Sequence, residues 1–120
     1  MTGCSGSDDA APDGTSAAAL EPAEALEAIG VEGTTVIDVR TPTEYADGHL
    51  VGARNIDLSA ETFTDRVSEL DRDATYVVYC RTGARSAEAA ARMADLGFTD
   101  VLDAGGLSDL VDAGGTTETT

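Results

Sequence analysis

A strand followed directly by a helix, with a cysteine on the turn between them, is the clearest structural pattern in this sequence. The strand is the β-branched run Thr75–Tyr79, the turn is the heptapeptide Cys80–Ser86, and the helix is an alanine-rich amphipathic stretch that ends at Gly97. Such a turn leaves the first backbone N–H groups of the helix unpaired, where they attract anions and stabilise a thiolate. Because the loop also contains two arginines, the cysteine is predicted to lie in electropositive surroundings and to be reactive.

Strands and helices alternate along the rest of the chain. Apolar β-branched runs predict strands, and apolar residues at helical spacing predict helices. The predicted strands are Thr34–Val39, Ala53–Ile56, Thr75–Tyr79 and Asp100–Leu102, and the predicted helices are Pro22–Ile29, Pro42–Tyr45, Glu61–Leu70, Arg85–Leu96 and Leu107–Val111. This alternation indicates an α/β fold in which helices cover both faces of a parallel sheet. Ligands of such sheets bind at the carboxyl ends of the strands, which is where Cys80 falls.

The chain is long enough for one domain. Its 120 residues lie within the usual size of a single domain, and 42% of them are apolar, which suffices for a core. Only 4% are aromatic, so Val, Ile, Leu and Ala must fill most of that core. Residues 1–19 are mostly Gly, Ser, Asp, Ala, Thr and Pro, and they predict a disordered tether. The folded domain is predicted over residues 20–114, and residues 115–120 are predicted to form a disordered tail.

Charge and residue counts argue against several classes of function. The formal net charge is -16 and all seven basic residues are arginine, which argues against nucleic acid or anionic lipid surfaces as partners. His49 is the only histidine, so the chain has no Cys/His cluster with metal-ligand spacing. Cys4 and Cys80 lie far apart in sequence, which argues against a disulfide framework. The sequence therefore predicts neither a metal nor a cofactor.

Three blocks of the sequence resemble those of one known family. The first block reads VIDVRTPTEY over Val36–Tyr45 and GHLVGARNI over Gly48–Ile56, the second is the loop Cys80–Ser86, and the third is Gly105–Leu107. In this order and spacing they resemble the rhodanese family, the sulfurtransferases that carry sulfane sulfur on a cysteine. The resemblance covers residues 20–114. It implies the rhodanese-like three-layer fold, with a central, mostly parallel sheet flanked by helices.

The resemblance implies a sulfurtransferase that works through a persulfide on Cys80. In that reaction the thiolate attacks the sulfane sulfur of a donor such as thiosulfate, sulfite leaves, and a cysteine persulfide remains. A thiophilic acceptor then takes the sulfur; it is cyanide in the assay reaction and a thiol, including a protein thiol, in the cell. No general base is needed if the helix terminus and the arginines have already formed the thiolate.

The rest of the loop is predicted to bind the donor. Its N–H groups would surround the terminal sulfur of the persulfide and hold its negative charge. Arg81 and Arg85 are the candidates for holding the sulfonate end of the donor, because a guanidinium donates to two oxygens at once. Gly83 allows the loop a backbone conformation that is closed to residues with a side chain. The predicted substrate-binding residues are Arg81, Thr82, Gly83, Ala84, Arg85 and Ser86.

Four other polar residues are predicted to serve the fold. His49 is unique in the chain, but in the matching family block this histidine lies away from the nucleophile. Asp38, Arg40 and Glu44 are predicted to form a hydrogen-bonded ion-pair group that fixes the first strand to the following turn, which specifies geometry more than it adds stability. Leu110 stands where the family commonly has a tryptophan, and this difference is expected to lower stability rather than activity.

Two other interpretations of the loop stay open. The first is a noncatalytic sulfur-carrier or binding module that receives sulfur from a partner protein, although an intact Cys80 with two arginines favours the enzyme. The second is a cysteine-based phosphatase or arsenate reductase, whose loop has the form C-x-x-G-x-x-R and usually follows a histidine. Here Tyr79 precedes the cysteine and the arginine comes one residue early. Such a loop should be too tight to wrap a phosphate group, so this interpretation ranks last.

The first residues resemble the end of a bacterial lipoprotein signal. Met1–Ser7 places small residues before Cys4 and begins a polar linker after it. On this interpretation Cys4 carries the lipid, and the domain is tethered in the cell envelope, outside the cytoplasmic membrane. The alternative is a cytoplasmic protein in which Cys4 is an ordinary thiol. No apolar run in the sequence approaches the length of about 20 residues that spanning a membrane requires.

Overall fold

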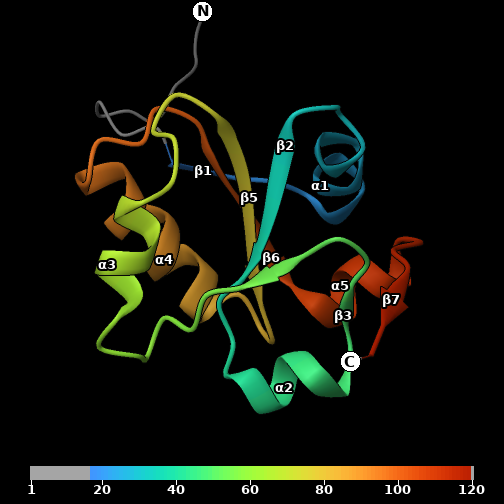
Figure 1. Ribbon diagram of the computed structural model, residues 1–120. Helices are drawn as coiled ribbons and strands as arrows, with labels where there is room; N and C mark the ends of the chain where they lie inside the picture. The colour runs from blue at the N-terminus through green and yellow to red at the C-terminus, as the bar shows by residue number, and fades with distance from the viewer. Residues whose placement is uncertain (1–16, 120) are drawn as a thin grey trace, which may run out of the picture.

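The computed structural model describes residues 17–119 of the chain (Figure 1). Its helices are α1 (Pro22–Ile29), α2 (Pro42–Asp47), α3 (Phe63–Ser68), α4 (Ala84–Asp95) and α5 (Leu107–Asp112). Its strands are β1 (Ala17–Ala19), β2 (Thr34–Asp38), β3 (His49–Leu50), β4 (Arg54–Asn55), β5 (Thr75–Cys80), β6 (Val101–Gly106) and β7 (Thr117–Glu118). None of the helices in this part of the chain is long and apolar enough to cross a membrane. Cys4 lies outside the described residues.

Five strands form a parallel sheet in the order β1-β6-β5-β2-β4. The central strand, β5, is buried along its whole length except at Thr75, which is partly exposed. Continuous burial is expected here, because helices cover both faces of a parallel sheet. A second, two-stranded sheet pairs β3 with β7 in the antiparallel sense. The predicted α/β architecture is therefore confirmed.

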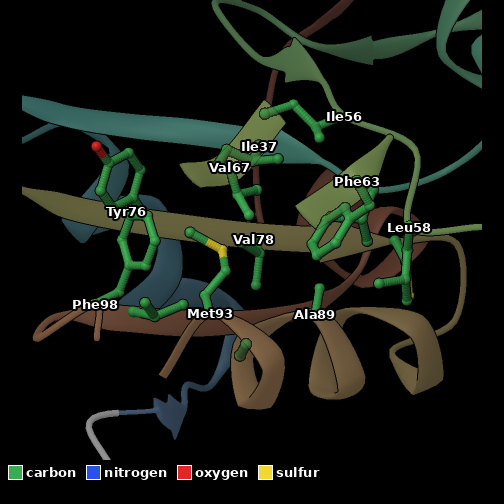
Figure 2. Close-up of a cluster of buried hydrophobic side chains, with 14 residues drawn as sticks. Ile37, Ile56, Leu58, Phe63, Val67, Tyr76, Val78, Ala89, Met93 and Phe98 are labelled. Carbon is green, nitrogen blue, oxygen red and sulfur yellow. The ribbon is translucent and has the colours of Figure 1, made fainter. Parts of the chain in front are cut away.

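Helices cover both faces of the sheet and give the molecule three layers (Figure 1). Successive residues of a strand point to opposite faces, so Val78 packs toward α3 and α4 while Val77 packs toward α1 and α5. Figure 2 shows the first of these two cores, in which Met93 and Ala89 of α4 lie beneath β5. Most of the core consists of aliphatic side chains, as predicted, but a few aromatic side chains are buried with them: Phe63, Tyr76, Tyr79 and Phe98.

Strand β6 is longer than the sequence predicted. Its apolar run ends at Leu102, but the strand continues to Gly106 through residues that are weak strand formers. The extension exists because β5 supplies partners for it: after a bulge at Val78/Tyr79, Tyr79 pairs with Gly105 and Cys80 pairs with Gly106. The longer strand brings the double glycine beside the cysteine.

Both ends of the described chain depart from the prediction. Ala17–Ala19, expected in the disordered tether 1–19, form β1 beside β6. Thr117–Glu118, expected in the disordered tail 115–120, form β7 beside β3, where the Glu118 carboxylate lies 3.4 Å from Nε2 of His49. Neither segment has the apolar alternation of a strand. Backbone partners on the neighbouring strand stabilise both, and the local composition of a segment does not reveal such partners.

Candidate active site

Cys80 lies at the carboxyl end of the central strand. Strand β5 ends at Cys80, residues 81–83 form the loop, and α4 begins at Ala84. The predicted strand-to-helix turn is therefore confirmed, with a helix that begins one residue earlier than Arg85. Gly83, the last residue before the helix, has a φ of 107°. This is a left-handed conformation that residues with a side chain avoid, which explains the glycine at this position.

The thiol of Cys80 is covered and receives a hydrogen bond. Its exposed fraction is 0%, and it belongs to the core between the sheet and helices α3 and α4. The N–H of Gly83 donates to Cys80 Sγ, with 2.8 Å between nitrogen and sulfur. The loop amide is thus turned toward the sulfur, as a site that stabilises a sulfur anion requires. The complete burial of the thiol was not evident from the sequence.

The loop lies directly over the double glycine of β6. A Cβ atom on Gly106 would lie 2.7 Å from the carbonyl oxygen of Arg81 and 3.2 Å from Cα of Thr82. Close-packed interiors leave no room for such an overlap, so only glycine fits at this position without moving the loop. The double glycine therefore forms the floor of the loop, a role that the sequence did not reveal.

Ser86, a predicted substrate-binding residue, is fully buried at the start of α4. Its hydroxyl donates to Asp103 Oδ1 at 2.6 Å, and the same oxygen accepts the N–H of Gly105 at 2.9 Å. The Ser86 side chain therefore ties α4 to β6. Asp103 was not among the site residues predicted from the sequence. The available signal was an acidic residue in the segment that leads from an apolar strand to the double glycine.

Arg85 is paired with a carboxylate of α2. Its Nη1 and Nη2 donate to Oε1 and Oε2 of Glu44 at 3.0 and 3.2 Å. The hydrogen bond from Arg85 lowers the pKa of Glu44 to about 2, against the opposing effect of partial burial. The structure thus corrects the prediction that Glu44 belongs to the group of Asp38 and Arg40. A local pattern could not show this contact, because it joins elements that are distant in sequence.

The predicted pair of Asp38 and Arg40 is confirmed. The Arg40 Nε and Nη2 atoms donate to the Asp38 carboxylate at 2.9 and 2.6 Å, and Nη2 also donates to the carbonyl of Gly48 at 2.6 Å. The Tyr79 hydroxyl donates to the same carboxylate at 2.8 Å. Burial, and next the Asp38 charge, raise the pKa of Tyr79. These contacts fix β2 to the turn before β3 and leave Asp38 fully engaged.

An open cleft of about 890 Å³ lies beside the loop. Of the predicted substrate-binding residues, Arg81 and Thr82 line it, whereas Cys80 does not because its side chain is covered. Arg81 is exposed, and its guanidinium makes no hydrogen bond or ion pair with any other residue in the described range 17–119. Carboxylates outnumber arginines along the cleft, where the charged residues are Arg40, Arg81, Glu44, Asp47, Asp109 and Asp112.

The sequence matches the Rhodanese-like domain family over residues 21–113. The chain belongs to this family. Among curated rhodanese relatives, the thiosulfate sulfurtransferase GlpE of Pseudomonas putida is 38% identical over 87 residues, which are 72% of this chain and 77% of GlpE. The probable adenylyltransferase/sulfurtransferase MoeZ of Mycobacterium tuberculosis is 42% identical over 67 residues, which are 56% of this chain and 17% of MoeZ. These relatives support sulfur transfer as the broad class of activity.

Solved structures agree with membership of the rhodanese-like family. A rhodanese-related protein from Thermoplasma volcanium has a TM-score of 0.73 and 30% identity, over 85% of this chain and 98% of that one. The Alr3790 protein from Anabaena has a TM-score of 0.71 and 30% identity, over 81% of this chain and 89% of that one. The three-layer rhodanese-like fold predicted from the sequence is therefore confirmed.

His49, which was predicted to serve the fold, and Leu110, which stands where a tryptophan was expected, both lie in the interior of this rhodanese-like domain. His49 is buried and stacks on the ring of Tyr45, with 3.7 Å between ring centroids, and its Nδ1–H donates to the Tyr45 carbonyl at 2.8 Å. Leu110 of α5 is fully buried in the core on the α1 and α5 side of the sheet. His49 therefore holds α2 to β3, and Leu110 packs in the same core as Ala25 of α1 and Val77 of β5.

Proposed function

We propose that this rhodanese-like domain is a thiosulfate sulfurtransferase that carries the transferred sulfur as a persulfide on Cys80. The observation that supports this most directly is the hydrogen bond from Gly83 N–H to the Cys80 sulfur, 2.8 Å long, at the carboxyl end of the central strand. A buried structural cysteine needs no donor aimed at its sulfur, whereas a thiolate or persulfide anion is stabilised by one. The name of the GlpE relative supports thiosulfate as the donor.

The reaction proceeds in two displacements on sulfur. In the first, the Cys80 thiolate attacks the outer sulfur of thiosulfate; a new S–S bond to Cys80 forms, the S–S bond of thiosulfate breaks, and its electron pair leaves with sulfite. In the second, cyanide or an acceptor thiolate attacks the outer sulfur of the persulfide, and Cys80 leaves as a thiolate. Electrons balance in each step, so no separate oxidant or reductant is required.

Arg81 is the residue that we propose for the sulfonate end of the donor. It lines the cleft, it is exposed, and no residue of the described chain engages its guanidinium. Arg85 was an equal candidate from the sequence, but its guanidinium is already held by Glu44. The remaining loop residues, Thr82 to Ser86, act in this proposal through their backbone N–H groups, which surround the persulfide sulfur.

Access to the sulfur requires a displacement of the loop, because no part of Cys80 is exposed. Arg81 and Thr82, which directly follow Cys80, are exposed and line the cleft. We therefore propose that the donor reaches Cys80 from the cleft as residues 81–83 move. A covered resting thiol also protects the sulfur from oxidation, since oxidation of cysteine depends on exposure.

The test of the proposed function compares two cysteine variants, Cys80→Ser and the matched control Cys4→Ser. After treatment with thiosulfate, mass spectrometry should find one added sulfur atom on the Cys80 peptide of the wild type and of Cys4→Ser. Cys80→Ser should gain no sulfur and should form no thiocyanate from thiosulfate and cyanide, with an unchanged circular dichroism spectrum. Sulfur transfer that survives in Cys80→Ser would remove this cysteine from the mechanism.

A sulfur-carrier module is the second candidate function. The observation that favours it is the charge of the cleft, where four carboxylates stand against two arginines and disfavour a small dianion. In that case a protein persulfide loads Cys80 and thiosulfate is turned over poorly. A phosphatase or arsenate reductase is less well supported, because the arginine that would hold the oxyanion, Arg85, is bound to Glu44.

The lipid anchor on Cys4 and a location outside the cytoplasmic membrane stay predictions from the sequence. They rest on the pattern of Met1–Ser7, which precedes the described residues. Fractionation of cells that express the natural gene tests both: a lipid-anchored protein sediments with membranes, and Cys4→Ser releases it. A protein that is found in the cytoplasmic fraction in both cases would support the alternative.

A further inference from the structure

The ion pair between Arg85 and Glu44 connects the first turn of α4 to the first turn of α2. Both guanidinium nitrogens reach the carboxylate, at 3.0 and 3.2 Å, and the two side chains are 35% and 25% exposed. A bidentate contact of this kind is among the strongest that arginine makes with a carboxylate. The two residues are 41 positions apart in sequence, so the fold itself builds the pair.

Glu44 is held in place independently of Arg85. Its Oε1 accepts the N–H of Thr41 at 3.1 Å and the hydroxyl of Thr41 at 3.2 Å. The N–H of Glu44 in turn donates to the Thr41 hydroxyl at 3.3 Å, which completes a capping box at the start of α2. The carboxylate is therefore positioned before any donor binds.

The pair places a charge-compensated arginine in the segment that follows Cys80. Its carboxylate partner Glu44 lines the cleft together with Arg81. The hydrogen bond to Glu44 is the largest cause that raises the pKa of Arg85. Glu44 compensates the charge of Arg85, so the loop keeps a single uncompensated cation. That cation is Arg81, which has no partner in the described part of the chain.

We propose that Glu44 is a positioning residue that sets donor specificity, because it holds Arg85 in a neutral pair and so disfavours dianionic donors relative to donors with one charge or none. This inference rests on the proposed function, since it concerns the donor of the Cys80 reaction. A dianion gains about twice as much as a monoanion from one extra unit of positive charge nearby. The pair therefore changes the ratio of kcat/KM for a dianionic donor to kcat/KM for a monoanionic donor. It does not change kcat/KM for both donors by the same factor.

The test uses two sulfane donors, thiosulfate with two negative charges and methanethiosulfonate with one. Attack by Cys80 on either donor gives the same persulfide and releases sulfite or methanesulfinate. Glu44→Gln keeps an oxygen for the Thr41 capping bonds but removes the charge, so Arg85 becomes an uncompensated cation. We expect the ratio of kcat/KM for thiosulfate to kcat/KM for methanethiosulfonate to rise roughly fivefold, mainly through the KM for thiosulfate.

The matched control is Glu88→Gln. It also removes one carboxylate from an arginine pair, Glu88 with Arg92 at 3.8 Å, but this pair lies on the exposed side of α4. The control should leave the donor ratio unchanged. An equal rise in both variants would show that the net charge of the protein, and not the pair at the loop, governs the choice of donor, and it would overturn the proposal.

A double variant tests the same proposal without an unpaired charge. The intact pair has no net charge, and neither does the double variant Glu44→Gln/Arg85→Gln, in which both charges are absent. The donor ratio should therefore return to within about twofold of the wild type. If Arg85 instead binds the sulfonate directly, the double variant should lose its preference for thiosulfate. That result, or an unchanged ratio in Glu44→Gln, overturns the proposal.

Failure of this inference is separable from failure of the proposed function. If neither donor places sulfur on Cys80 of the wild type, the proposed function is wrong, and so is the inference. If both donors place sulfur there but the donor ratio is unchanged in Glu44→Gln, only the inference is wrong.

Discussion

At the scale of single residues, the site depends on a position that has no side chain. Gly106 lies beneath the backbone of Arg81 and Thr82, and the amide of Gly83 reaches Cys80 only while the loop stays in this position. Close packing of this kind leaves no slack for an added methyl group. The β6 backbone therefore shapes the pocket as much as the loop sequence does.

Gly106→Ala should displace the loop. A Cβ atom 2.7 Å from the Arg81 carbonyl must push the loop away from the thiol, so we expect sulfur transfer to fall at least about tenfold and stability to fall by about 1 to 3 kcal/mol. Thiocyanate formation and urea unfolding measure the two effects. Gly30→Ala is the control, because Gly30 has an ordinary φ of -75° and its Cβ would lie 3.5 Å from the nearest atom. Wild-type activity in Gly106→Ala would show that the loop tolerates displacement.

At the scale of elements, α4 is held against β6 by a hydroxyl–carboxylate contact. Ser86 Oγ lies 2.6 Å from Asp103 Oδ1, which also accepts the N–H of Gly105. Because Gly105 precedes the glycine beneath the loop, one carboxylate connects the helix, the strand and the floor of the site. The position of the helix N-terminus relative to the thiol follows from this contact.

Ser86→Ala should cost about 1 to 3 kcal/mol of unfolding free energy, because the Asp103 carboxylate loses its closest donor in a partly buried place. Urea unfolding followed by circular dichroism measures the change. Ser59→Ala is a matched control: its hydroxyl donates to Asp57 at 2.7 Å in the same way, but on the surface, and its loss should cost less than about 0.5 kcal/mol. Equal losses in the two variants would mean that burial of the contact does not matter.

The elements that the sequence predicted correctly are those whose own residues favour them. Strand β5 and helix α4 follow from a continuous apolar run and from helical spacing, and Cys80 on the turn between them follows from both. The extension of β6 beyond Leu102 depends on partners in β5, so no local pattern shows it. Within the site, the Glu44–Arg85 pair and the fit of Gly106 were hidden for the same reason. They arise from tertiary contacts between segments that are distant in sequence.

At the scale of the whole molecule, a formal net charge of -16 opposes the approach of any anion. The range of this repulsion depends on ionic strength, since the screening length is about 8 Å at 0.15 M and about 30 Å at 0.01 M. At physiological salt a donor in the cleft therefore meets mainly the charges that line it. At low salt the donor meets the charge of the entire molecule.

Thiosulfate turnover should consequently increase with salt at low ionic strength. We expect kcat/KM for thiosulfate to rise about threefold or more between 0.01 and 0.15 M NaCl, and kcat/KM for methanethiosulfonate to rise less, because repulsion scales with the charge of the donor. Steady-state kinetics across the salt series measure both, and circular dichroism at each concentration separates this effect from salt-dependent folding. A fall in kcat/KM with salt would mean that attraction by Arg81 outweighs the repulsion from the remaining surface.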